Sequence, residues 1–292
     1  KAAILVQQNE PLIVDKIELP KVLDVGQVLV KVHTSGICGS QLGEISGVKG
    51  KDKFLPHLMG HEGCATVLEI GPGVKYLKKG DKVVLHWRKG QGIESATPKY
   101  LWRGGFVNAG WVTTFNTHAI VSENRCTSIP KDTNEDLAAL FGCAITTGFG
   151  VIENNANLKM GQSIVIFGAG GVGLNMIQAA AMHSAWPIIA VDLYQTKLDL
   201  AKLYGATHTI NSSRNDAFIS ITSIVKDEGI DIFIDNTGQP KIIEEGYKLI
   251  NKDLFKNSRL ISSKSCLKIN QLLEILFKEK RINNLIQIGA ND

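Results

Sequence analysis

Cysteine is scarce in this chain and is not arranged for disulfide bonds. Five cysteines occur among 292 residues, an odd number at irregular spacing. A disulfide framework needs paired cysteines, usually in a short secreted chain. We therefore expect free thiols in a reducing compartment, the cytoplasm.

An excess of charge is also missing. The chain has 32 Lys and Arg residues against 28 Asp and Glu residues, for a formal net charge of +4. This balance gives no electrostatic reason to expect a nucleic acid or a membrane surface as a partner. We expect neither.

Charged residues are absent from residues 161–191, a pattern that hydropathy alone would assign to a membrane span. Five glycines interrupt this stretch, as do Asn175, Gln178, His183 and Pro187. A buried parallel strand followed by a core-facing helix has the same composition. The sequence therefore favours a buried strand and helix over a membrane span.

A glycine-rich loop lies inside this uncharged stretch. It follows Ile164–Phe167, a predicted strand, and precedes an apolar helix. The loop has the pattern GxGxxG, with the residues Gly168, Ala169, Gly170, Gly171, Val172 and Gly173. The first glycine permits a tight turn, the second lets the backbone approach a pyrophosphate, and the third lets the helix pack near the strand. The alternative is a tight strand–helix turn that binds no ligand.

An acidic residue at the end of the next strand indicates which dinucleotide would bind. The predicted strand Pro187–Val191 leads directly into Asp192. A carboxylate at this position accepts hydrogen bonds from the ribose hydroxyls of adenosine and repels a 2′-phosphate. The pattern therefore favours NAD as the cofactor.

The two halves of the chain differ in their secondary-structure pattern. Residues 1–130 are rich in β-branched and alternating segments, of which Gln27–His33 is an example, and Thr133 and Asn134 are predicted helix N-caps. From Gly161 onward strands and helices alternate, which predicts a parallel sheet with helices on both faces. The predicted elements beyond Asp192 are helix Gln195–Leu203, strand Ala206–Ile210, helix Asp216–Lys226, strand Ile230–Asp235 and helix Lys241–Leu249.

The β-rich half contains residue types that bind a metal. Two thiols, Cys38 and Cys143, together with the imidazole of His61 and the neighbouring carboxylate of Glu62, could hold a catalytic zinc ion. Spacing alone is weak support, because a lone cysteine is usually a small core residue and a lone histidine is usually structural. Cys64, Cys126 and Cys266 lack partners at ligand spacing, and we expect them to be buried thiols.

Several short motifs resemble those of the zinc-dependent medium-chain alcohol dehydrogenases and stand in the same order along the chain. They are GICGS (36–40), GHEG (60–63), EIGPGV (69–74), KGDKV (79–83), GCAITTGFG (142–150), GAGGVG (168–173) and the pair Val191-Asp192. The resemblance implies an α/β protein with a GroES-like β-barrel catalytic domain and a Rossmann domain, a doubly wound parallel sheet. We place the catalytic domain at residues 1–147, the NAD-binding domain at 148–265, and a C-terminal helix with an incomplete return segment at 266–292.

The resemblance also implies roles for individual residues. Cys38, His61 and Cys143 would hold a single zinc ion that polarises the substrate oxygen, with Glu62 as an alternating ligand or support. Ser40 would pass the proton outward, Thr147 would lie near the nicotinamide, and Lys197 would meet the adenosine ribose with Asp192. The substrate would be a small alcohol or aldehyde, or a sugar-type compound, and the protein would be a dimer or a tetramer.

The sequence departs from this family in the site and in one lobe. Gln41 stands where many relatives have an acid, and Gly43 stands where some have a relay histidine. No cysteine occurs between His86 and Trp111, where relatives often place four around a structural zinc, so we expect only the catalytic one. In this lobe tryptophans alternate with Arg and Lys, which suits either an anionic or sugar substrate or an ordinary surface loop.

The end of the chain also departs from the family. Residues 259–263 resemble the strand after the one that should follow Asp235, so we expect residues near Lys252–Lys256 and near the C-terminus to be omitted from the sequence, with a natural deletion as the alternative. Residues 270–280 are predicted to form a helix. Two other functions stay open: a zinc-free NAD(P)H reductase of the same superfamily, and a cofactor-binding homologue without turnover.

Overall fold

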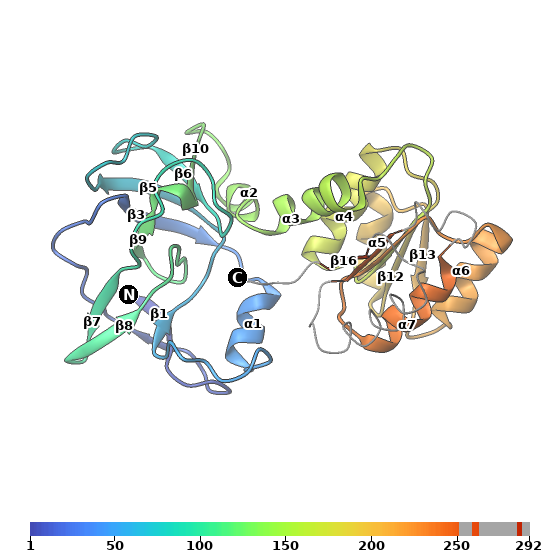
Figure 1. Cartoon of the computed structure of the whole chain (residues 1–292), viewed down its shortest axis with the longest axis horizontal. Coiled ribbons are helices and arrows are strands. Elements are labelled where there is room, and N and C mark those ends of the chain that lie inside the picture. The colour runs from blue at the N-terminus through green and yellow to red at the C-terminus, as the bar shows by residue number, and fades with distance from the viewer. Residues whose placement is uncertain (251–258, 263–284, 288–292) are drawn as a thin grey trace. The chain divides into compact units, whose positions relative to one another are not determined.

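The computed structural model describes residues 1–250, 259–262 and 285–287 and contains two units, Lys1–Ala144 and Ile145–Asp292 (Figure 1). The first unit is built from two five-stranded sheets. The strand order of one sheet is β2 (Ile13–Asp15), β1 (Ala2–Leu5), β4 (His57–Leu58), β8 (Gly105–Asn108) and β7 (Lys99–Trp102). The order of the other is β10 (Cys126–Ile129), β6 (Lys82–Leu85), β5 (Gly63–Ile70), β3 (Gln27–Ser35) and β9 (His118–Ser122). Its helices are α1 (Gly39–Ile45), α2 (Glu135–Leu140) and the 3₁₀ turn η1 (Glu123–Arg125).

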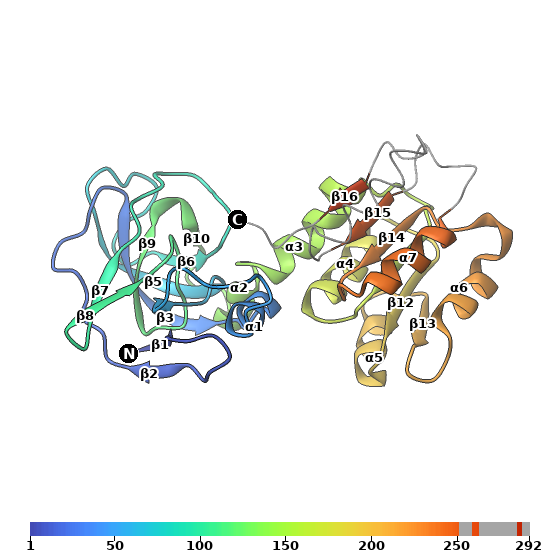
Figure 2. The same ribbon diagram turned by 60° about the horizontal axis from the view of Figure 1, so that its bottom comes forward.

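Apolar side chains from the two sheets, whose strands Figure 2 shows, meet in a shared core. Ile4, Tyr100 and Val107 of the first sheet pack with Ile120 of the second. The buried hydroxyl of Tyr100 accepts a hydrogen bond from the backbone N–H of Ile120 at 2.8 Å. The phenol thus fills the core and satisfies a buried polar group, as buried tyrosines usually require.

A charged network organises the lobe that lacks cysteine. The buried carboxylate of Glu123 accepts hydrogen bonds from the backbone N–H groups of Lys75 (2.6 Å), Tyr76 (2.9 Å) and Ile93 (2.8 Å). Arg125, also buried, binds Glu94 at 3.0 Å and donates to the backbone carbonyl of Trp87. These contacts join the lobe to the segments that precede and follow it in the chain.

The tryptophans and cations of the lobe contact other protein groups. Trp102 donates its indole N–H to Asp15 at 3.0 Å, and Arg103 binds the same carboxylate while lying 4.8 Å from the Trp102 ring centroid. Arg125 lies 5.2 Å from the ring centroid of Trp111. For these residues the structure favours the surface-loop interpretation.

The second unit is a six-stranded parallel sheet with helices on both faces. The strand order is β13 (His208–Asn211), β12 (Ile188–Asp192), β11 (Ile164–Phe167), β14 (Ile232–Asp235), β15 (Arg259–Ser262) and β16 (Leu285–Gln287). Its helices are α3 (Ala144–Gly150), the π-helix η2 (Val151–Ala156), α4 (Gly171–Met182), α5 (Gln195–Leu203), α6 (Ala217–Val225), the 3₁₀ turn η3 (Lys226–Glu228) and α7 (Pro240–Leu249).

Successive side chains of each central strand enter opposite cores, which is why these strands are apolar throughout. Ile164 and Ile166 of β11 pack with α4 and α5, whereas Val165 and Phe167 pack with α6 and α7. Figures 1 and 2 show these helix pairs on the two faces of the sheet. The predicted alternation of strands and helices is confirmed, and α5 has the predicted bounds.

The expected omission near Lys252–Lys256 falls outside the described residues and stays a prediction. Strand β15 pairs directly with β14 in parallel, with Ile232 opposite Arg259 and Asp235 opposite Ser262. The segment after α7 therefore supplies the next strand of the sheet, and the backbone of β14 is paired along both edges. The helix predicted at 270–280, Cys266 and nearly all of the segment 266–292 lie outside the described residues, whereas Cys64 and Cys126 are buried as predicted.

No helix within the described ranges is both long and apolar enough to span a bilayer. The uncharged residues 161–191 contain β11, α4 and all of β12 except Asp192. The strands β11 and β12 are buried in the core of the second unit, as predicted.

The contact between the glycine-rich loop and α4 leaves no room for a side chain at Gly173, where a Cβ atom would overlap the carbonyl oxygen of Gly168. We expect Gly173→Ala to lower the free energy of unfolding by about 3 kcal/mol, because backbone must move to admit the methyl group. Gly171→Ala is the matched control, since a Cβ there meets nothing within 4 Å, and we expect a change within about 0.5 kcal/mol. Urea unfolding followed by far-ultraviolet circular dichroism measures both; equal effects would contradict this packing.

The Glu123 network generates a prediction about pH. Burial acts to raise the pKa of Glu123, but the hydrogen bonds from Tyr76, Ile93 and Lys75 outweigh it, and the pKa is lowered. A lowered pKa gives stability that is present above the unfolded value, about 4.3, and is lost as pH falls through the folded value. We expect Glu123→Gln to lower the free energy of unfolding at pH 7 by about 1–3 kcal/mol, because one amide oxygen cannot serve three donors.

The difference between this variant and the wild type should shrink below about pH 4. Urea unfolding followed by tryptophan fluorescence at several pH values measures it. The exposed Glu69→Gln on β5 serves as control. A difference that did not change with pH would show that the charge of Glu123 is unimportant.

Candidate functional site

The pairing of β3 with β5 brings Cys38 and His61 together. Ser35, the last residue of β3, lies opposite Gly63, the first residue of β5. One residue further on, the backbone N–H of Gly36 donates to the carbonyl of Glu62 at 3.0 Å. Cys38 then begins α1 as its N-cap residue. Residues 38 and 61 are distant in sequence but leave the same end of one strand pair.

Cys143 reaches the same place through a close approach of backbone. The helix α2 begins where predicted, since the Asn134 side chain accepts a hydrogen bond from the Leu137 N–H at 2.9 Å. After α2, Gly142 passes so close to Leu85 and Glu62 that a Cβ atom would overlap the Leu85 carbonyl oxygen and the Glu62 backbone. Glycine is therefore required at 142, and it sets the position of Cys143.

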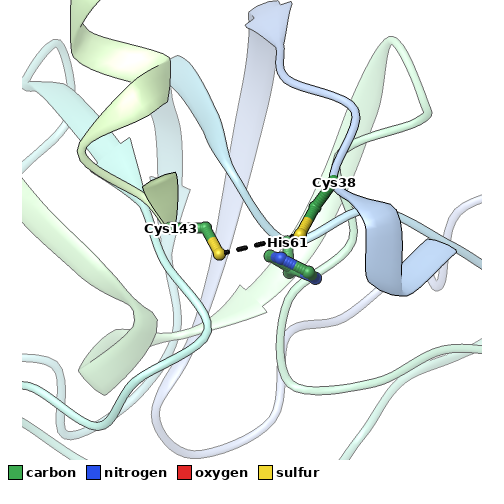
Figure 3. Close-up of side chains that lie close together, drawn as sticks. All are labelled: Cys38, His61 and Cys143. Carbon is green, nitrogen blue, oxygen red and sulfur yellow. Dashed lines mark hydrogen bonds between the residues drawn. The ribbon is translucent and has the colours of Figure 1, made fainter. Parts of the chain in front are cut away.

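The side chains of Cys38, His61 and Cys143 form a compact group (Figure 3). One ligand atom from each lies within 4.8 Å of the others, and the two sulfur atoms are 3.9 Å apart. A Zn–S bond of about 2.3 Å with tetrahedral angles places two sulfur ligands about 3.8 Å apart. The separation of the thiols is therefore the one that a tetrahedral zinc ion requires.

The imidazole of His61 has one nitrogen available for a metal. Its Nδ1 lies 2.6 Å from Nε2 of Gln41, whereas its own Nε2 is buried without a hydrogen-bond partner in the described part of the chain. A buried polar atom without a partner is unfavourable unless a ligand satisfies it. The donor set and this orphaned nitrogen together fit zinc.

The electrostatics of the group favour the metal-binding form of Cys38. The contact with the Cys143 thiol lowers the pKa of Cys38, and the neighbouring His61 and Ser40 lower this pKa further. Thiolate, not thiol, is the form that binds a metal. Burial raises the pKa of Glu62, and the negative charge of Cys38 raises it further.

Glu62 and Ser40 lie beside the group but not within it. The metal-ligand group formed by the described residues does not include a Glu62 carboxylate oxygen. One of these oxygens, Oε2, is buried without a hydrogen-bond partner among the described residues. The hydroxyl of Ser40 accepts a hydrogen bond from Gln41 at 3.2 Å. The alternating-ligand role of Glu62 and the relay role of Ser40 stay predictions.

The glycine-rich loop of the second unit has the features of a phosphate cradle. Gly168 has φ +92°, a left-handed conformation that lets β11 turn into α4. A Cβ atom at Gly170 or Gly171 would meet nothing within 4 Å, so there is open space beside the first turn of α4. The N–H groups at this helix end favour an anion.

Asp192 is held in place beside this loop. Its carboxylate accepts hydrogen bonds from the backbone N–H groups of Ala169 (2.8 Å) and Tyr194 (3.0 Å). The Lys197 ammonium lies 3.8 Å from the same carboxylate and 4.9 Å from the Tyr194 ring centroid. The structure thus gathers the glycine-rich loop, Asp192 and Lys197, while Thr147 lies half-buried on α3.

The contacts of Gln41 and of the Glu123 network could not be predicted from the sequence. Gln41 was visible only as a departure from an expected acid, although its hydrogen bonds join two ligand residues. Glu123 and Arg125 gave one usable signal, two opposite charges spaced by one residue directly after an apolar strand. The partners of both charges are far away in sequence, so pattern alone could not identify them.

Comparisons with known proteins agree with this architecture. Residues 24–131 match the family model "Alcohol dehydrogenase GroES-like domain", and residues 171–254 match "Zinc-binding dehydrogenase". The class-3 alcohol dehydrogenase of Cereibacter sphaeroides is 29% identical, over 86% of this chain and 75% of its own length. S-(hydroxymethyl)glutathione dehydrogenase of Paracoccus denitrificans is 28% identical with the same coverage. The crystal structure of benzyl alcohol dehydrogenase from Acinetobacter calcoaceticus aligns with TM-score 0.78 and 26% identity, covering 99% of this chain and 83% of that one.

The chain belongs to the zinc-dependent medium-chain dehydrogenase family. The predictions of the family and of a GroES-like unit with a Rossmann unit are confirmed. It is a zinc-type oxidoreductase, and NAD is the standard cofactor of such alcohol dehydrogenases.

The geometry of the thiols predicts the metal content. We expect about one zinc ion per purified chain, lost in Cys143→Ala because two remaining ligands cannot fix the ion. Cys64→Ala is the matched control, since it removes a fully buried thiol outside the group and should keep the zinc. Elemental analysis of the three proteins measures this. A Cys143→Ala protein with full zinc content would exclude this ligand set, and two zinc ions in the wild type would contradict the single-metal prediction.

Proposed function

We propose that this protein transfers a hydride between the carbon of a small alcohol and NAD⁺, with Cys38, His61 and Cys143 as the zinc ligands. The observation that carries the proposal is the 3.9 Å separation of the two thiols beside an unpaired imidazole nitrogen. When bound, zinc supplies a Lewis acid for the substrate oxygen. The two thiolates balance its charge.

The other residues of the site determine the path of the substrate proton and support the zinc ligands. Ser40, half-buried and two residues after Cys38, takes the hydroxyl proton of the alcohol and passes it outward in this proposal. Gly43 offers no side chain that could continue this path, so the proton leaves through water or the cofactor ribose. Glu62, whose pKa is raised by burial, supports the ligands next to His61.

The second unit supplies the cofactor site of this proposal. The residues Gly168, Gly170, Gly171, Val172 and Gly173, with the first turn of α4, bind the pyrophosphate through backbone N–H groups. Asp192, fixed by the Ala169 and Tyr194 N–H groups, accepts hydrogen bonds from the ribose hydroxyls, and the Lys197 ammonium donates to them. Thr147 contacts the nicotinamide.

The proposed cellular location follows from the chemistry of the thiols. The thiols of Cys38 and Cys143 bind zinc only while they are reduced, which supports a cytoplasmic location. The boundaries at 147/148 and 265/266, the dimer or tetramer, and the absence of nucleic acid and membrane partners stay predictions. A sugar-type substrate loses the support of Arg103, because this cation is paired with the carboxylate of Asp15.

A single set of assays tests the function against its rivals. The zinc-loaded protein is supplied with primary alcohols, benzyl alcohol, S-(hydroxymethyl)glutathione and polyols, together with NAD⁺ or NADP⁺, and the absorbance of NADH or NADPH is followed. We expect turnover with NAD⁺ at a kcat/KM about a hundredfold above that with NADP⁺. Asp192→Ser should lower the ratio of kcat/KM with NAD⁺ to kcat/KM with NADP⁺ about tenfold or more, because the charge that repels a 2′-phosphate is removed.

The rivals predict different results. Turnover that survived in a zinc-free Cys143→Ala protein would indicate a zinc-free reductase. Normal NADH binding with no reaction of any alcohol or aldehyde would indicate a cofactor-binding homologue.

A further inference from the structure

Gln41 joins two of the zinc ligands through one buried amide. Its side chain is 1% exposed. Its Oε1 accepts a hydrogen bond from the backbone N–H of Cys38 at 2.9 Å. Its Nε2 lies 2.6 Å from Nδ1 of His61 and donates to Ser40 Oγ at 3.2 Å.

This arrangement fixes where the hydrogen of a neutral His61 lies. An amide nitrogen carries only hydrogens, so Nδ1 of His61 must accept from it. The hydrogen of the neutral ring is then on Nε2, the nitrogen left for the metal. A neutral histidine that binds zinc through Nε2 carries its hydrogen on Nδ1 instead, and it needs an acceptor there.

In the metal-free arrangement Gln41 donates a hydrogen bond to Nδ1 of His61, whereas in the metal-bound arrangement it must accept one from Nδ1–H. To accept from Nδ1–H, the amide must turn over and present its oxygen to His61. Its nitrogen would then face the backbone N–H of Cys38, which would lose its acceptor. A primary amide has one oxygen, at one end, and cannot accept from both residues.

We propose that Gln41 is a positioning residue that weakens the hold of this site on zinc, so that the metal exchanges readily. The inference rests on the proposed zinc-dependent function. A carboxylate of the same length has two acceptor oxygens, one for Cys38 N–H and one for His61 Nδ1–H. Replacing the amide by that carboxylate should therefore remove the conflict that zinc binding creates.

Zinc release from the loaded protein into excess pyridylazoresorcinol, a coloured chelator, tests the proposal. We expect Gln41→Glu to release zinc about tenfold more slowly than the wild type, the order of effect of such supporting groups. Gln41→Leu should release it about tenfold faster, because it offers no acceptor to either residue.

Gln27→Glu is the matched control. Gln27 is also buried in the first unit, where its amide accepts from Asp24 N–H at 2.9 Å and donates to the Ala96 carbonyl at 3.1 Å. It contacts no zinc ligand, so we expect the wild-type release rate. A merely structural role for Gln41 predicts faster release from both Gln41 variants, because both lose wild-type contacts, and that result would overturn the proposal.

A measurement on the wild type alone covers the case in which a variant does not fold. Long-range ¹H–¹⁵N spectra, assigned with His61→Gln, should place the ring hydrogen on Nε2 in the zinc-free protein and on Nδ1 in the loaded one. A hydrogen already on Nδ1 before zinc is added would overturn the inference. A wild type that binds no zinc would instead overturn the proposed function, and with it this inference.

Discussion

The antiparallel pairing of β3 with β5 is the contact on which the candidate metal site depends. It brings the segment after Ser35 beside the segment before Gly63, and the Gly36–Glu62 hydrogen bond extends the pairing by one step. Two ligands therefore have their positions determined by a sheet register. A one-residue slip would turn the side chains of the strand to the other face. The buried valines of β3 oppose that slip, because their burial would be lost.

The third ligand depends on a different constraint. Gly142 packs against backbone at the end of β6 and beside Glu62, and a larger residue would push Cys143 away from the other ligands. The site thus combines a register, which hydrophobic burial fixes, with a close approach that only glycine allows. Both belong to the first unit, and neither involves the ligand side chains themselves. The positions of Cys38, His61 and Cys143 are therefore set by the backbone around them.

Local physics made part of this structure predictable from the sequence. The cap at Asn134, the bounds of α5 and the glycine-rich loop follow from short-range patterns, and they occur where those patterns indicate. The ligand residues came from short motifs rather than from spacing. The direct pairing of β15 with β14 and the partners of Glu123 could not be predicted, because both are contacts between distant segments. The hydrogen bonds of Gln41 could not be predicted either, because the sequence does not indicate the direction of a side-chain hydrogen bond.

The candidate zinc ligands and the amide of Gln41 all lie at or before Cys143, whereas the glycine-rich loop and Asp192 lie after Ala144. If these residues have the proposed roles, metal chemistry and cofactor preference are encoded in separate, consecutive stretches of the gene. A recombination crossover between the codons for Ala144 and Ile145 would transfer a complete set of zinc ligands, with Gln41, to a new nucleotide-binding partner. Under the proposed roles, such a crossover would transfer the lability of the metal independently of the choice of dinucleotide.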